Sequence, residues 1–79
     1  MRLPRELSGD ELIARLRRFG YEPTRQSGSH VRLTRVAEGA EQHITIPRHS
    51  PLRVGTLNVI LSDVAAQVGV SRDELLRRL

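Results

Sequence analysis

Three histidines, at positions 30, 43 and 49, are the side chains of this chain that titrate close to neutral pH when unperturbed. General acid–base catalysis at neutral pH would most simply use one of them. Most surface histidines have no catalytic role, so the choice among the three depends on the residues that surround each of them in the sequence. His30 stands out because it follows Gly28 and Ser29, whose backbone amides can approach a phosphate group closely. We therefore take His30 as the first candidate for proton transfer.

Other kinds of catalytic site are poorly represented in the sequence. The chain has no cysteine, which excludes disulfides, a thiolate nucleophile and cysteine-based zinc sites. No two histidines have the spacing of a helical metal-binding pair, so we expect no metal and no cofactor. The acidic pairs at 10–11 and 73–74 fall where helices are expected to begin, and carboxylates are common there for capping reasons. Gly28-Ser29-His30 lacks the second glycine of a serine-hydrolase nucleophile motif.

All 13 basic residues are arginine, against nine acidic residues, which gives a formal net charge of +4. Residues 1–35 contain eight arginines and four acids, whereas residues 36–79 contain five of each. The guanidinium fork matches phosphate oxygens, so a basic surface in the first half would suit a nucleic acid, although codon bias explains the missing lysines equally well. Only Phe19 and Tyr21 are aromatic, which disfavours binding of single strands by base stacking and permits recognition of double-stranded RNA.

The residues flanking these candidates predict three helices. Ser8 and Glu11 form a capping-box pattern before a helix over about 9–19, which Gly20 ends. An apolar stripe after Gly55 predicts the longest helix, closed by Gly69. A second capping-box pattern at 71–74 predicts a short terminal helix.

Between the helices, alternation of apolar and polar residues predicts strands. Residues 21–26 contain a proline and are expected to form an edge segment, followed by a tight turn at 27–29. Residues from 30 to 46 predict a hairpin around a loop at 37–41, with Arg35 opposite Gln42. This register buries four aliphatic side chains and leaves the other face polar; the two sets are Val31, Leu33, Ile44 and Ile46, and His30, Arg32, Thr34, His43 and Thr45.

These elements predict one α+β domain over residues 1–79, in the order α-β-β-β-α with a short extra helix at the end. Helices would cover one face of a small antiparallel three-stranded sheet. The first residues contain no continuous apolar stretch typical of a secretory signal, and no apolar run reaches the ~18 residues of a membrane span. The expected location is the cytoplasm.

Taken together, three short motifs resemble the HicA family of mRNA interferase toxins. They are Gly28-Ser29-His30 at a turn and strand start, Pro47-Arg48-His49 at a strand end, and Gly55-Thr56-Leu57 at a helix start. They follow one another in the order and at about the spacing of the family, within a resemblance that spans nearly the whole chain. The chain differs in having no lysine, so its phosphate contacts would have to use arginine.

The resemblance implies a toxin of a type II toxin–antitoxin system that cleaves mRNA, has a double-stranded RNA-binding-like fold and is inhibited by a HicB-type antitoxin. It also implies that His30 is the catalytic histidine. RNA supplies its own nucleophile, the 2′-hydroxyl, so an imidazole and phosphate-binding groups could suffice without a metal. The candidates for contacting RNA are the amides of Gly28 and Ser29 and the side chains of Arg32 and Arg48. His49 is either a second proton donor or a residue that orders the strand end.

Two other interpretations remain open on the sequence. The chain could be a non-catalytic module that binds double-stranded RNA, with His30 donating a hydrogen bond to phosphate. It could also be a protein-interaction domain, which would show no salt-dependent RNA binding. For a toxin, we expect an acidic antitoxin to cover the surface formed by His30, Arg32 and Arg48.

Overall fold

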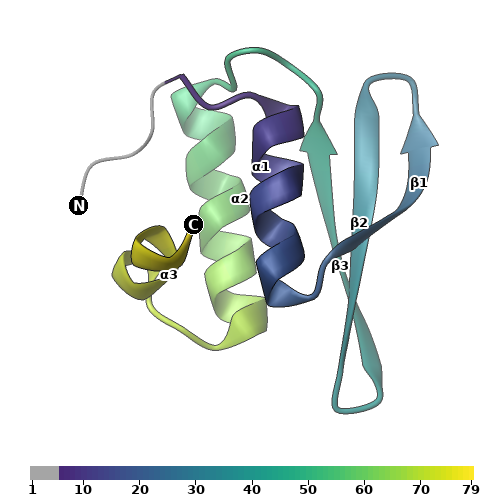
Figure 1. Cartoon of the computed structure of the whole chain (residues 1–79), viewed down its shortest axis with the longest axis vertical. Helices are drawn as coiled ribbons and strands as arrows, with labels where there is room; N and C mark the ends of the chain where they lie inside the picture. The colour runs from purple at the N-terminus through teal and green to yellow at the C-terminus, as the bar shows by residue number, and fades with distance from the viewer. Residues whose placement is uncertain (1–5) are drawn as a thin grey trace.

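The computed structural model describes residues 6–79 and places two helices against one face of a three-stranded antiparallel sheet (Figure 1). The element order is α-β-β-β-α-α, as the sequence predicts. The helices are α1 (Gly9–Leu16), continued by a 3-10 turn (Arg17–Phe19), α2 (Val54–Val68) and α3 (Arg72–Arg78). The strands are β1 (Glu22–Ser27), β2 (His30–Ala37) and β3 (Ala40–Pro47), with β2 in the centre.

The first helix begins with the predicted capping box. The Ser8 hydroxyl accepts from the Glu11 amide, and the Glu11 carboxylate accepts from the Ser8 amide, each at 3.1 Å. Gly20 ends the element at φ 92°, in the left-handed region that glycine adopts without steric cost. At α3 only half of the predicted box forms: Ser71 accepts from the Glu74 amide, but the Glu74 carboxylate pairs with Arg77 and Arg78 instead.

The predicted hairpin register is confirmed. Arg35 lies opposite Gln42, Leu33 opposite Ile44 and Val31 opposite Ile46. The expected loop over 37–41 is wrong, because the strands continue to Ala37 and Ala40 and leave a two-residue turn. Glu38 and Gly39 both have positive φ (53° and 78°), which is the geometry that suits the twist of a tight hairpin.

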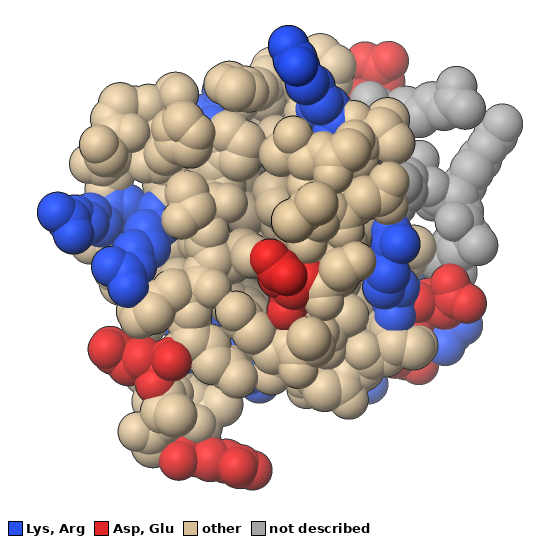
Figure 2. Space-filling view, turned by 180° about the vertical axis from the view of Figure 1, so that it is seen from behind, with Lys and Arg blue, Asp and Glu red and all other residues tan. Residues whose placement is uncertain are grey.

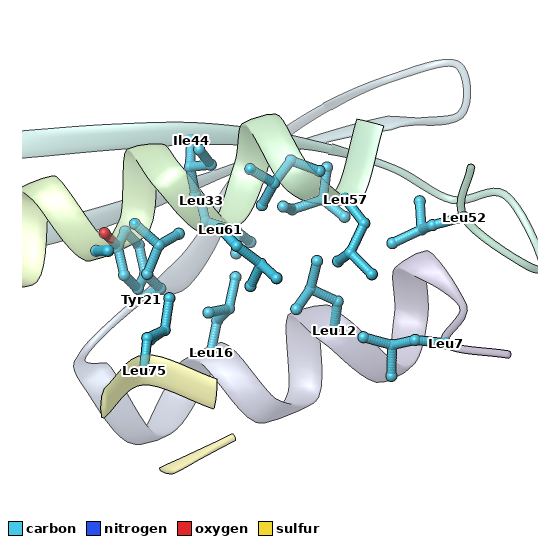
Figure 3. Packing of buried hydrophobic residues seen from close by; sticks show 14 of the residues in the cluster. Leu7, Leu12, Leu16, Tyr21, Leu33, Ile44, Leu52, Leu57, Leu61 and Leu75 are labelled. Carbon is cyan, nitrogen blue, oxygen red and sulfur yellow. The ribbon is translucent and has the colours of Figure 1, made fainter. Parts of the chain in front are cut away.

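The core lies between the helices and the covered face of the sheet (Figure 3). Aliphatic side chains from α1, β2, β3, α2 and α3 meet there, and Leu12, Leu16 and Leu33 are fully buried. Tyr21 is also fully buried, and its hydroxyl donates to Gln67 Oε1 at 2.6 Å. Phe19 packs against the core but is only partly buried. The two aromatic side chains are therefore used for packing.

The edge strand β1 lies outside this packed layer. All six of its residues are exposed, so β1 is accessible on both faces. In residues 6–79 no single helix is long and apolar enough to cross a membrane; α2 and α3 meet that test only as a pair joined across a 96° bend.

Candidate active site at the end of the sheet

The β1–β2 turn places His30 at an exposed end of the sheet. Gly28 adopts φ 58°, and an added Cβ there would have no atom within 4 Å, so the backbone is open to solvent. His30 follows as the first residue of β2, with its Cα opposite Pro47 at the end of β3. The turn residues and His30 are all exposed. Substrate groups can therefore approach the His30 ring and the amides of Gly28 and Ser29.

The end of β3 brings a second histidine to the same place. The ring centroids of His30 and His49 lie 6.5 Å apart, with an angle of 69° between the ring planes. The two residues are 19 positions apart in sequence, and pairing of β2 with β3 joins them. Two imidazoles at this separation can each reach a different oxygen of one bound phosphate after small side-chain rotations.

Backbone hydrogen bonds hold the segment that carries His49. The Arg48 amide donates to the Ser29 carbonyl at 2.7 Å, and the His49 carbonyl accepts from the Gly9 amide at 2.9 Å. Gly9 packs so closely that an added Cβ would lie 2.0 Å from the Pro47 carbonyl oxygen. The strand end is thereby fastened to both the β1–β2 turn and the first turn of α1.

An ion pair fixes the Arg48 guanidinium. Arg48 Nε donates to Asp10 Oδ1 at 2.7 Å, and Arg48 Nη2 donates to Asp10 Oδ2 at 3.2 Å. These hydrogen bonds, with the charge of the guanidinium, lower the pKa of the Asp10 carboxyl and raise the pKa of Arg48. A guanidinium has five N–H donors, so the edge formed by Nη1 and Nη2 remains able to bind an anion. Asp10 positions Arg48 without using all of its donors.

The other predicted contacts lie along the polar face of the sheet. Arg32 is two residues beyond His30 on β2 and shares its face, and it is partly exposed. His43 lies four register positions from His30, roughly 13 Å along the sheet, and its Nδ1 contacts Thr34 Oγ1 at 3.0 Å. The structure thus brings together His30, His49, Arg48 and the turn, with Arg32 beside them, and it leaves His43 outside.

His43 instead lines a groove between β3 and α2. The groove has a volume of about 470 Å³, and its other lining residues include Thr45, Val59 and Asp63. Its walls combine a strand edge with the exposed side of α2, and neither His30 nor His49 lines it. Within residues 6–79 no group of three or more histidine or acidic side chains is arranged to hold a metal ion.

The first-half arginines do not form one surface. Arg35 is partly buried and donates to the carbonyl oxygens of Phe19 and Gln67, so its role is structural. Arg17 pairs with Glu22 at 3.6 Å. Basic side chains do gather at the side of the molecule where β1 and β2 lie, as Figure 2 shows in the view from behind.

Sequence reasoning missed two contributors to the site. Asp10 was assigned to helix capping alone, and the local pattern holds no signal that it would meet a residue 38 positions away. Gly9 lies between the two capping residues, and a glycine where capping permits many residues is a weak sign of close backbone approach. Both residues lie in the first turn of α1. No pattern in the sequence predicts that this turn packs against Pro47-Arg48-His49.

Comparison with known proteins identifies a family. The family model described as HicA toxin of bacterial toxin–antitoxin systems matches residues 9–69, which extend from the start of α1 to the glycine that ends α2. No curated protein and no solved structure shows significant similarity to the chain. The matched range covers well over half of the 79 residues and contains every site residue described above. This chain therefore belongs to the HicA family, and it is a toxin of a toxin–antitoxin system whose function implies a cognate antitoxin.

Proposed function

We propose that this toxin is an endoribonuclease that cleaves mRNA without a metal, using His30 as its catalytic residue. The observation that carries the proposal is the exposed His30–His49 pair, with ring centroids 6.5 Å apart beside an open glycine turn. Membership of the HicA family supports it. Messenger RNA is a cytoplasmic substrate, so we propose that the toxin acts in the cytoplasm.

The proposed reaction is an internal transfer at one phosphodiester. His30 accepts the proton of a 2′-hydroxyl while the 2′-oxygen forms a bond to the adjacent phosphorus. The bond from phosphorus to the 5′-oxygen of the next nucleotide breaks, and His49 donates a proton to that oxygen. The products are a 2′,3′-cyclic phosphate and a free 5′-hydroxyl, so atoms and charge balance without a cofactor.

Negative charge on the phosphorane needs fixed donors. The free edge of the Arg48 guanidinium, held in place by Asp10, is the cationic candidate on the β3 side. The amides of Gly28 and Ser29 face the same open end of the sheet and can bind a phosphate oxygen. Arg32 lies two residues farther along β2, where it can contact the RNA backbone beyond the reacting phosphate.

Cleavage of a long mRNA by purified protein in the presence of EDTA tests the proposal. The wild-type chain should cut, and His30→Ala should lose roughly two to four orders of magnitude in rate while still binding RNA. His43→Ala is the matched control, because it removes a histidine from the same face outside the site, and its rate should stay close to wild type. If the wild-type protein is folded and shifts RNA on a gel but leaves the RNA intact, the proposal is wrong. The chain would then be a non-catalytic RNA-binding module.

We further propose that the antitoxin is of the HicB type and covers His30, Arg32 and Arg48. An acidic partner on this surface would use the same charges as RNA, and would therefore block the substrate directly. The double variant Arg32→Ala and Arg48→Ala should weaken binding of both RNA and antitoxin. Unchanged antitoxin affinity in this variant would rule out a shared surface.

A further inference from the structure

A bulge in β1 places two arginines opposite each other on the polar face of the sheet. Pairing of β1 with β2 shifts between Pro23 and Arg25, and beyond the shift the Cα of Arg25 lies opposite that of Arg32. Directly opposed residues of an antiparallel pair share one face, so the bulge at Thr24 turns Arg25 to the side of Arg32. The Thr24 hydroxyl also lies on this side, 2.7 Å from the Thr34 hydroxyl.

These two guanidinium groups have no partner among residues 6–79. Neither takes part in an ion pair or a side-chain hydrogen bond within that range, in contrast to Arg17, Arg35 and Arg48. Like charges directly across two strands repel and destabilise the pairing. Arg25 is exposed and Arg32 partly exposed, so both can reach a ligand. Figure 2 shows basic side chains gathered on this side of the molecule. The repulsion between the two guanidinium groups costs stability in the free protein, and a bound anion would relieve it. The arginine pair is therefore suited to binding an anion.

We propose that Arg25 and Arg32 together bind the RNA phosphate adjacent to the one that reacts at His30. The inference rests on the ribonuclease function proposed above and adds a named phosphate site to it. His30 and Arg32 are two residues apart on β2, about 7 Å along one face, so a strand running along β2 would present successive backbone phosphates to them. Two guanidinium forks can contact the oxygens of one phosphate from opposite sides.

This contact recognises the backbone and carries no base preference. It fixes the register of the RNA relative to His30, because one phosphate held at the arginine pair places the next at the imidazole. Its loss should weaken binding equally for different sequences. Its signature is a change in salt dependence, since each phosphate neutralised on a single strand contributes about 0.7 to the slope of log K against log salt concentration.

The test measures binding of a mixed-sequence single-stranded oligoribonucleotide to protein that carries His30→Ala and leaves the RNA intact. Arg25→Gln and Arg32→Gln are added singly and together. Arg72→Gln is the control, with the same charge change as each single variant, at the start of α3 and remote from the sheet (Figure 1). The double variant should bind at least tenfold more weakly than the control, with a salt slope smaller by about 0.7. Affinity and slope equal to those of the control would overturn the proposal.

A second measurement needs no arginine substitution. In the His30→Ala protein, the Nε–H resonances of Arg25 and Arg32 should shift on addition of the RNA, while that of Arg72 should not. Unshifted Arg25 and Arg32 signals with bound RNA would refute the site. A double variant that loses antitoxin binding and keeps RNA affinity would also refute it and assign the pair to the antitoxin.

The ribonuclease proposal fails separately. A wild-type chain that never cleaves RNA, while the double variant loses RNA binding and salt slope, would leave the phosphate site standing and remove only the catalysis.

Discussion

Asp10 and Arg48 form a two-point ion pair between the first turn of α1 and the residue after β3, with both carboxylate oxygens accepting from the guanidinium. Both side chains are exposed, so the pair contributes little to global stability. Its consequence is local, because it fixes the direction of the Arg48 fork at the residue that precedes His49.

Asp10→Asn should therefore impair cleavage more than folding. A neutral amide can accept only at one oxygen, so Arg48 loses its two-point orientation. We expect kcat to fall roughly three- to thirtyfold with little change in KM, measured on a short RNA substrate. Equal kcat values for Asp10→Asn and wild type would show that Asp10 does not position Arg48.

The same pair predicts a pH dependence of stability. Arg48 lowers the pKa of Asp10 in the folded protein, so the stabilisation is complete above about pH 4 and is lost as pH falls through the lowered value. Thermal unfolding of wild type and Asp10→Asn should differ slightly at neutral pH and converge in acid. If the difference in stability between the two proteins grew on acidification, the predicted direction of the pH dependence would be wrong.

His49→Gln separates proton donation from ordering of the strand end. The backbone carbonyl that binds Gly9 survives the substitution, so the fold should be retained. If His49 is the proton donor, the rate should fall by roughly two orders of magnitude. A near wild-type rate would assign His49 to ordering of the strand end alone.

Gly9→Ala should disturb the site through the backbone. The new methyl group would overlap the Pro47 carbonyl, so α1 and the end of β3 must separate. We expect a loss of about 1–3 kcal/mol in the free energy of unfolding, measured with urea, and slower cleavage by the protein that remains folded. Gly55→Ala is the matched control: it points into open space and should change stability by no more than about 1 kcal/mol.

Tyr21 offers a spectroscopic check of the core, because it is the one tyrosine in a chain without tryptophan. Burial raises the pKa of its hydroxyl, although nearby Arg35 acts in the opposite direction. Phenolate absorbance should therefore appear above the ordinary pKa of about 10, and stability should decline as pH rises through the raised value. Tyr21→Phe should remove the signal and, with the hydrogen bond to Gln67, about 1 kcal/mol of stability. Titration at the ordinary value would mean that Tyr21 is exposed.

Local patterns in the sequence were sufficient to predict the helices, the strands and the pairing of the β2–β3 hairpin. The Ser8–Glu11 capping box, the glycine stops and the pairing of Leu33 with Ile44 depend on interactions within a few residues or on strict alternation, which any alternative register would violate. The loop at 37–41 is shorter than predicted because Glu38, a non-glycine residue, adopts a positive φ. Nothing in the residue type of Glu38 indicates this conformation.

By itself, the sequence determined the α-β-β-β-α order, the polar face of the sheet and the choice of His30. The predicted register also set His30 across from Pro47-Arg48-His49. Only the tertiary structure gave the geometry of the His30–His49 ring pair, brought Asp10 to Arg48 and set Arg25 opposite Arg32. The physical reason is that these relationships depend on how segments pack and on an irregularity in strand pairing, neither of which a local pattern encodes. The first turn of α1 packs on the end of β3, and one extra residue in β1 changes which of its side chains lie on the polar face of the sheet. Hydrophobic periodicity, in contrast, reports only which side of each element is buried.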